Sequence, residues 1–396
     1  MYTAAQIHEF VEKNKQEAID CLKEIVQTPS VTEDEVAISK VFCKWIKQAG
    51  LEPEIHGIAP EHPNVLGEWF GSQPGKRFIF NGHMDTFPPV EGDPGLYGPF
   101  SGKIVDGYLY GRGSSDMKGG DAAALMAVTL LKRMGFDPKG SVLLSYMCDE
   151  EIGGRYGVKW LVKQNLLNGD FGICMEPTSG KVLVAHSGIY RIFFTYTAPA
   201  ASSYRDHPTK NALEKSITAI NALYQYRDQV VRKKTDPYFD CPSLSITTLH
   251  AGLATNVHAS QSRFSIDYRL VPGETHESVG KEIFGILDAL KVQDPEMEYT
   301  YEIISDRPVL EVPEDSEIVK ACCEAYQEVT GKTAELYRRH GGSDAATIYG
   351  YNGIQMPNWG AANDTDEPTK PNEKINLKDY LQSIEYYMLT VVKMMG

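Results

Sequence analysis

The chain has 396 residues, of which 42% are hydrophobic and 23% are charged, a composition typical of folded globular proteins. Because a single hydrophobic core stops growing at roughly 250–300 residues, this length predicts two domains. The formal net charge of −14 excludes the basic surface that nucleic acids and anionic membranes require of a partner. The chain has no run of about 18 apolar residues and no signal-peptide core near its start, so we expect a cytoplasmic protein.

The first half of the chain alternates between predicted helices and predicted strands. Apolar residues recur at helical spacing in some segments, whereas shorter apolar runs that end in polar residues predict buried strands. In chain order, these are helices at 3–26 and 34–49, a strand at 77–86, a helix at 121–134, a strand at 141–151, a helix at 157–167 and a strand at 171–177. This order predicts an α/β fold with a mostly parallel sheet and helices on both faces.

From residue 187 onwards the pattern changes to strands in which apolar and polar residues alternate. The predicted elements are strands at 189–197, 243–252 and 262–271 and helices at 211–231 and 276–290. This order predicts a small α+β sandwich of one sheet and two helices.

After residue 306 the α/β pattern returns, with a strand predicted at 353–357 and a final helix at 377–395. The sandwich is therefore expected to be inserted into the first domain. We predict a catalytic domain made of 1–186 and 305–396, and an inserted lid domain at 187–304.

Four consecutive predicted strands or loops of the first domain each offer a metal-ligating side chain. These side chains are His83, Asp116, Glu151 and Glu176. In a parallel sheet, functional groups gather beyond the carboxyl ends of the strands. Imidazole and carboxylate groups are ligands that Zn²⁺, Co²⁺ and Mn²⁺ accept, so the sequence predicts a hydrolytic metal site with one or two ions.

Two further carboxylates have predicted roles beside these ligands. Asp85 follows His83 by two residues on the same side of a strand, where it can orient the imidazole through its other ring nitrogen. Glu150 and Glu151 are neighbours that point to different sides, so one can bind metal while the other accepts a proton from the attacking water.

The seven cysteines form no C-x-x-C pair and are expected to be reduced, mostly buried residues. Cys148 and Cys174 lie close in sequence to the candidate carboxylates. A soft metal ligand at either position is the less favoured alternative.

Several motifs together resemble one family of zinc-dependent deacylases and exopeptidases. It includes acetylornithine deacetylase, succinyl-diaminopimelate desuccinylase, aminoacylase and glutamate carboxypeptidase. The motifs, in chain order, are GHMDTFPP, LYGRGSSDMKGG, CDEEIGG, MEPT, NV at Asn256, DYRLVPGE and GGSDA. The resemblance covers nearly the whole chain and is specific for the family, though not for any substrate.

The resemblance implies a role for each matched residue of the metal site. His83 and Glu176 would hold one ion, and Asp116 would bridge it to a second. Glu151 would hold the second ion. Glu150 would be the general base, and Asp85 would orient His83.

The resemblance also implies how substrate and a second subunit are bound. Asn256 and Arg269 match lid positions that contact substrate, and the loop Gly341, Gly342 and Ser343 matches one that lines a pocket for the substrate's carboxylate. Arg269 has an alternative role, in which it only braces the lid through Asp267. The inserted sandwich matches a dimerisation domain, so a homodimer is expected.

The chain departs from the family at one metal-ligand position near its C-terminal end. Family members carry a histidine before a PNE-like turn, where this chain has Thr369, and no histidine follows His340. A hydroxyl is a poorer ligand than imidazole, so the ion beside Glu151 is expected to bind weakly or to be absent. The possible substitutes, which are more simply explained as a solvated acidic turn, are Asp364, Asp366 and Glu367.

A second departure lies in the lid, where a family histidine stabilises the oxyanion of the intermediate. Ser202 lies nearest the expected place, and His207 follows five residues later. Without His207, a contribution on the order of 2–4 kcal/mol must come from elsewhere. The alternatives are His340, Arg338 and Arg339, which an exposed basic cluster would also explain.

These observations lead to one favoured function and two alternatives. The favoured function is a metal-dependent amidohydrolase that cleaves the C–N bond of a small carboxylate-bearing substrate, such as an N-acyl amino acid or a dipeptide. One alternative keeps the scaffold but changes the reaction to a deamination, a lyase step or acyl transfer. The other is a ligand-binding protein that has lost catalysis.

Overall fold

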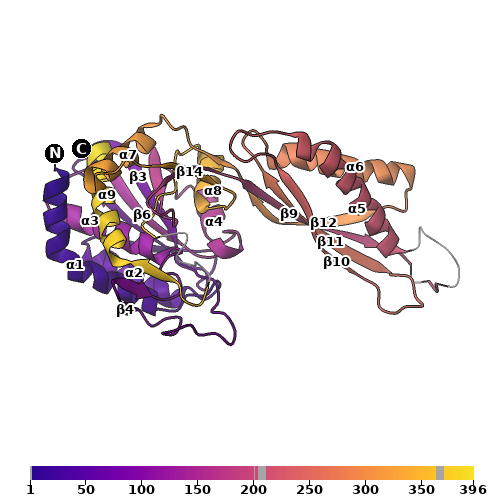
Figure 1. Cartoon of the computed structure of the whole chain (residues 1–396), viewed down its shortest axis with the longest axis horizontal. Coiled ribbons are helices and arrows are strands. Elements are labelled where there is room, and N and C mark those ends of the chain that lie inside the picture. Colours follow the sequence, from indigo (N-terminus) through magenta and orange to yellow (C-terminus); the bar gives the residue numbers. More distant parts are fainter. Residues whose placement is uncertain (1, 200, 204–210, 363–369) are drawn as a thin grey trace. The chain divides into compact units, whose positions relative to one another are not determined.

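The computed structural model describes residues 2–199, 201–203, 211–362 and 370–396. The chain divides into two compact units (Figure 1). The larger unit comprises Met1–Ala185, Val312–Tyr337 and Ser343–Gly396, and the smaller unit comprises His186–Glu311 and Arg338–Gly342. The smaller unit therefore interrupts the larger one in the chain.

The larger unit is built on a five-stranded sheet whose spatial order is β1-β2-β6-β3-β7. Strand β3 lies between β6 and β7 and runs parallel to both, whereas β2 is antiparallel to both of its neighbours, β1 and β6. The predicted α/β fold with a mostly parallel main sheet is confirmed. The strand bounds are β1 (Pro53–His56), β2 (Asn64–Phe70), β3 (Gln73–His83), β6 (Lys139–Met147) and β7 (Phe171–Cys174).

Helices lie on both sides of this sheet, with α3 and α9 on one side and α4 and α8 on the other (Figure 1). The outer helices α1 and α7 pack against α9. The helices are α1 (Ala4–Gln27), α2 (Val36–Gln48), α3 (Lys118–Arg133), α4 (Val158–Lys163), α7 (Glu317–Thr330), α8 (Asp344–Asn352) and α9 (Leu377–Met395).

Small residues allow α3 to approach the sheet closely. A Cβ atom at Gly120 would lie 2.2 Å from the carbonyl oxygen of Met175, and one at Gly82 would lie 1.8 Å from a carboxylate oxygen of Asp121. Real Cβ atoms do not approach so closely, so only glycine permits this packing. The start of α3 is thereby held beside the strand ends that carry His83 and Glu176.

The helix α9 supplies much of the buried apolar surface of the larger unit. The side-chain oxygen of its N-cap, Asn376, accepts hydrogen bonds from two backbone N–H groups of the first turn. The ring of Tyr387 packs against Phe80 of β3, with 5.4 Å between the centroids. Burying one such large side chain stabilises the fold by about 1.5–3 kcal/mol.

The smaller unit is a four-stranded antiparallel sheet, in the order β10-β11-β9-β12, with two helices packed on one face. Its core includes Phe194, Tyr196 and Phe264, all fully buried. The fourth strand, β12, was absent from the predicted elements. The elements are β9 (Gly188–Thr197), α5 (Ala212–Gln229), β10 (Ser243–Ala251), β11 (Gln261–Leu270), α6 (His276–Gln293) and β12 (Tyr299–Arg307).

The remaining short strands lie outside these two sheets. Strands β4, β5 and β15 form a small antiparallel sheet. The predicted strand at 353–357 is wrong, because the segment forms only one isolated bridge, at Gln355, and further isolated bridges follow at Asn358. The bounds are β4 (Lys103–Val105), β5 (Tyr108–Tyr110), β8 (Val182–His186), β13 (Leu310–Glu311), β14 (Leu336–Arg339) and β15 (Lys374–Asn376).

No helix in the part of the chain that the structure describes combines the length and apolar character needed to cross a membrane.

Candidate metal centre

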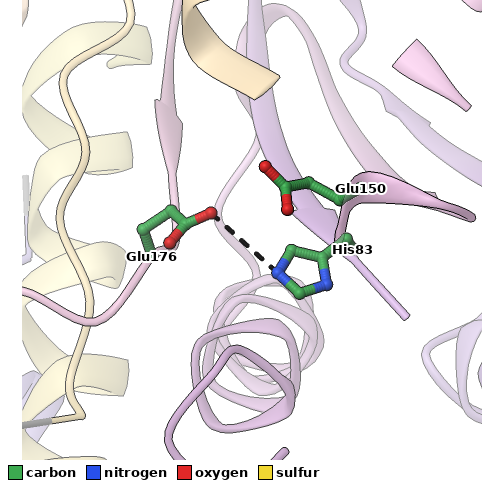
Figure 2. Close-up of side chains that lie close together, drawn as sticks. All are labelled: His83, Glu150 and Glu176. Atoms are coloured by element: carbon green, nitrogen blue, oxygen red, sulfur yellow. Dashed lines mark ion pairs between the residues drawn. The ribbon is translucent and has the colours of Figure 1, made fainter. Parts of the chain in front are cut away.

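His83 is the last residue of β3, and its imidazole is buried. Its Nδ1 atom lies 2.9 Å from the carbonyl oxygen of Asp85. Because a carbonyl can only accept a hydrogen bond, Nδ1 carries a proton, which leaves Nε2 as the ring atom that a metal ion could bind. The Nε2 atom lies 3.3 Å from Asp116 Oδ1. It lies 3.9 Å from Glu176 Oε1, an ion pair that Figure 2 marks with a dashed line. The imidazole is therefore oriented to offer Nε2 as a metal ligand.

Five side chains form two overlapping groups of candidate ligands. One group is His83, Glu150 and Glu176, and the other is His83, Asp116 and Glu151. Within each group, the candidate ligand atoms lie within 4.8 Å of one another. Figure 2 shows that Glu150 and Glu176 direct their carboxylates toward the space beside the His83 ring. The structure thus brings together all four predicted ligands and the predicted base.

The carboxylates of this centre are close enough together to need a bound cation. Burial raises the pKa of Glu151 well above its ordinary value, and the neighbouring Asp116 carboxylate raises it further. Burial disfavours a charged His83, but its hydrogen bonds to Asp116 and Asp85 raise its pKa overall. Several buried carboxylates this close together cannot all be ionised unless a positive charge lies between them. The imidazole and carboxylate donors therefore fit a divalent ion such as Zn²⁺, Co²⁺ or Mn²⁺.

The carboxylate of Asp85 holds the turn that carries the two adjacent glutamates. Its oxygens accept hydrogen bonds from the backbone N–H groups of Glu150, at 3.0 Å, and Glu151, at 3.2 Å. A third donor is the hydroxyl of Thr32, at 2.9 Å. The carboxylate lies 3.5 Å from His83 Nδ1, so the backbone carbonyl makes the closer contact with the ring. Asp85 thus places both the imidazole and the predicted base.

Asp149, which was not among the predicted site residues, also makes hydrogen bonds that hold this turn. Its backbone has a φ of 53°, and its carboxylate accepts from the N–H groups of Tyr156, at 2.9 Å, and Gly157, at 2.8 Å. Its own N–H donates to Glu35 Oε1 at 3.2 Å. The only sequence signal for Asp149 is its place at the start of the DEE triplet.

Comparison with known proteins places the chain in a family. The model of the peptidase family M20/M25/M40 matches residues 79–393, which include every candidate ligand. The chain belongs to this family. The resemblance inferred from the sequence is therefore confirmed, and this M20 enzyme is a metal-dependent hydrolase that acts on amide or peptide bonds. A deaminase, lyase or acyltransferase activity and a non-catalytic role are not favoured.

Relatives match over nearly the whole chain. A succinyl-diaminopimelate desuccinylase of Parvibaculum lavamentivorans is 30% identical over 92% of this chain and 94% of its own. An M20 family metallo-carboxypeptidase of Sulfolobus solfataricus has a similar fold, with a TM-score of 0.77, 18% identity and coverage of 96% and 99% of the two chains. A putative aminohydrolase of methicillin-resistant Staphylococcus aureus has a TM-score of 0.78 at 19% identity, with both chains fully covered.

Cys148 and Cys174 of the M20 enzyme are buried thiols rather than ligands of this centre. Burial raises the pKa of both thiols, which disfavours the thiolate that binds metal. Neither cysteine belongs to a group of three close ligand atoms among the described residues. The expected role as small core residues is supported.

Arg269 and Asn256 are residues of the smaller unit that were predicted to contact substrate. Arg269 donates to both carboxylate oxygens of Asp267, at 2.7 and 3.3 Å, and Arg191 donates to the same carboxylate at 2.7 Å. This is the bracing contact that the sequence analysis gave as the alternative. Asn256 is exposed. Its role in substrate binding, like that of Arg269, stays a prediction.

The predicted glycine loop falls at a unit boundary, with Gly341 and Gly342 in the smaller unit and Ser343 in the larger. The hydroxyl of Ser343 donates to Asn358 Oδ1 at 3.1 Å.

His340 is exposed, and the centroid of its ring lies 5.3 Å from that of Phe239. The guanidinium group of Arg338 stacks over the ring of Tyr238. The substrate-binding roles of His340 and of the loop at 341–343 stay predictions. Outside the described residues lie His207, Asp364, Asp366, Glu367 and Thr369.

Replacing Glu35 with glutamine is expected to alter how stability depends on pH. Glu35 is fully buried, and burial raises its pKa from 4.5 to about 7. The folded state therefore binds more protons than the unfolded state between these values, and the stabilising contribution is lost as pH rises through 7. Glutamine cannot ionise, so the variant should gain about 2 kcal/mol relative to wild type between pH 5 and pH 8.

Urea unfolding of the metal-free protein and of Glu35→Gln at both pH values would measure this gain. Both proteins retain Asp149, whose pKa burial raises to about 6, so its contribution cancels in the comparison. An equal stability difference at pH 5 and pH 8 would show that Glu35 ionises as freely when folded as when unfolded.

Proposed function

We propose that this M20 enzyme hydrolyses the amide bond of a small substrate that carries a carboxylate, such as an N-acyl amino acid or a dipeptide. The main support is the buried imidazole of His83, whose Nε2 atom faces the carboxylates of Asp116 and Glu176. A relative named succinyl-diaminopimelate desuccinylase, 30% identical, makes N-succinyl amides the first substrates to test.

Four residues of the centre would hold the metal, and a fifth would move the proton. His83, Asp116, Glu151 and Glu176 offer the donor atoms. A bound ion supplies Lewis-acid chemistry, which polarises a carbonyl group and makes water more acidic. Glu150, whose N–H is held by Asp85, accepts the proton of the attacking water and donates it to the nitrogen of the leaving amine.

A substrate panel tests this function. The purified chain would be supplied with Zn²⁺, Co²⁺ or Mn²⁺ and assayed for amine release from N-succinyl, N-acetyl and other N-acyl amino acids and from dipeptides. Hydrolysis of any member supports the proposal. No release from any member, with metal shown to be bound, would contradict it. Release of ammonia or acyl transfer to an amine would indicate one of the alternative reactions.

The number and identity of the ions are part of the proposal. We propose zinc, with cobalt or manganese as substitutes, and weaker binding of a second ion because Thr369 occupies the position of a ligand histidine. Metal analysis of the purified chain measures the number directly. About one ion per chain supports the depleted site, whereas about two ions would mean that another residue replaces the histidine.

We also propose that the enzyme is a cytoplasmic homodimer that associates through the smaller unit. Strand β10 is an edge of its sheet and lies beside α5. These two elements line a shallow hollow of aliphatic, tyrosine and threonine side chains, which include Ile217 and Leu249, 43% and 41% exposed. An edge strand with unpaired backbone groups and an apolar border is suited to pairing with a second copy.

Replacing Ile217 with aspartate is expected to weaken the dimer at least about 10-fold, because a charge would be buried in an apolar interface. Sedimentation equilibrium would measure the association. Val292→Asp, at a residue of α6 that is 84% exposed, is the control and should leave it unchanged. A monomeric wild-type protein, or an Ile217 variant that dimerises normally, would contradict this interface.

A further inference from the structure

The carboxylate of Glu373 is buried at the end of the chain's last loop, immediately before β15. Four donors point at its two oxygens. Oε2 accepts from Arg112 Nη1, at 2.7 Å, and from the backbone N–H of Gly113, at 3.0 Å. Oε1 accepts from the backbone N–H groups of Ser115, at 2.9 Å, and Asp116, at 3.0 Å. These donors occupy roughly all four acceptor positions of a carboxylate.

All four donors belong to one short loop, which carries the metal ligand Asp116. The backbone of Glu373 holds the same loop, since its carbonyl accepts from the N–H of Gly111 at 2.9 Å. Three of the four side-chain contacts fix backbone N–H groups, so they define the path of the loop rather than the rotamer of one side chain. The carboxylate of Glu373, 257 residues away in sequence, therefore fixes the position of the Asp116 backbone N–H.

The charges show that this contact is specific for a carboxylate. The side chains of Arg112 and Glu373 are only 4% and 1% exposed, so each buried charge needs the other. All four groups are donors, which suits an ionised carboxylate with acceptor sites alone. A glutamine of the same size would turn its NH₂ group toward two of them.

We infer that Glu373 is a positioning residue that fixes Asp116 for metal binding. The inference rests on the proposed function only in taking Asp116 as a ligand. Asp116 Oδ1 lies 3.3 Å from His83 Nε2, so a small displacement of the loop changes the distance between two atoms that would hold the same ion. Removing a residue that hydrogen-bonds a metal ligand typically weakens metal affinity by about 10–100-fold.

The test compares Glu373→Gln with Glu68→Gln in the full-length chain. Glu68 is a matched control, because it accepts two hydrogen bonds from Arg77 and one from the hydroxyl of Ser141 but belongs to neither ligand group. Metal-free protein would be titrated with Zn²⁺ against a competing chelator, and the Co²⁺ form would be examined by visible absorption. Circular dichroism would show whether each variant is folded.

The expected result for Glu373→Gln is Zn²⁺ binding weakened by about 10–100-fold and an altered Co²⁺ spectrum, with normal folding. Glu68→Gln should bind Zn²⁺ as wild type does. Wild-type affinity and spectrum in a folded Glu373→Gln protein would overturn the inference. Because the readout is metal binding, a wild-type chain that hydrolyses no substrate would contradict the proposed function without affecting this comparison.

A second variant covers the case in which Glu373→Gln does not fold. Glu373→Asp keeps the charge but withdraws the carboxylate from the Asp116 loop by one methylene group. It should show the same weakened Zn²⁺ binding, and wild-type affinity would overturn the inference. If neither variant folds while Glu68→Gln does, Glu373 is a residue of general stability and the inference is also overturned.

Discussion

Glu150→Gln is expected to lower kcat by about 10²–10⁴-fold while the bound metal stays at the wild-type level. The amide keeps the size of the side chain and its turn but cannot accept the proton of the attacking water. The turn itself is held by main-chain hydrogen bonds to Asp85, which the substitution leaves in place. Steady-state kinetics on any substrate found in the panel, together with metal analysis, would measure both quantities.

The neighbouring residue provides the matched control. Glu151→Gln removes a candidate ligand from the group of His83 and Asp116, so its metal content should fall. The two variants together separate a base from a ligand, which matters because Glu150 lies within ligand distance of His83 and Glu176. A Glu150→Gln protein that loses metal would make Glu150 a ligand. One that retains activity would exclude it as the base.

His83→Ala is expected to abolish specific metal binding and, with it, hydrolysis. His83 belongs to both groups of candidate ligands and supplies their only imidazole. The loss of affinity should exceed the roughly 10–100-fold that removal of an outer partner costs, because a direct ligand is lost. Equilibrium dialysis with Zn²⁺ would measure it.

His8→Ala is a suitable control for this second experiment. His8 lies on α1, where it contacts Glu385, and it belongs to neither candidate ligand group. Its replacement should leave Zn²⁺ binding unchanged. Zn²⁺ retained by His83→Ala at wild-type affinity would show that the centre described here is not where this enzyme holds its ion.

The sequence predicted those parts of the enzyme that follow from local patterns. Buried apolar runs that end in polar residues located β3, β6 and β7, and the polar ends supplied His83, the DEE triplet and Glu176. A strand with mostly exposed residues gives no such signal, which is why β12 was missed. The segment at 353–357 is apolar enough for a strand, but tertiary packing leaves it with one isolated bridge.

The contacts that support the ligands were harder to predict. Asp85 was expected to reach His83 through its carboxylate, but its carbonyl makes the closer contact and the carboxylate serves the Glu150 turn. Glu373 was noticed only as part of a PNE-like turn. Its partners are mostly backbone N–H groups, which every residue except proline has. No pattern of side chains in the sequence therefore predicts the contact.

The position of α9 has a consequence for how the protein is made. Packing of α9 against α1, α3 and α7 joins the first elements of the larger unit to its last helix. During synthesis, the strands that carry His83 and Glu176 leave the ribosome roughly 200–300 residues before α9 does, at roughly 5–20 residues per second. The nascent chain must wait on the order of ten seconds or more with apolar surface uncovered. The smaller unit, apart from Arg338–Gly342, is complete well before then, so it is expected to fold first.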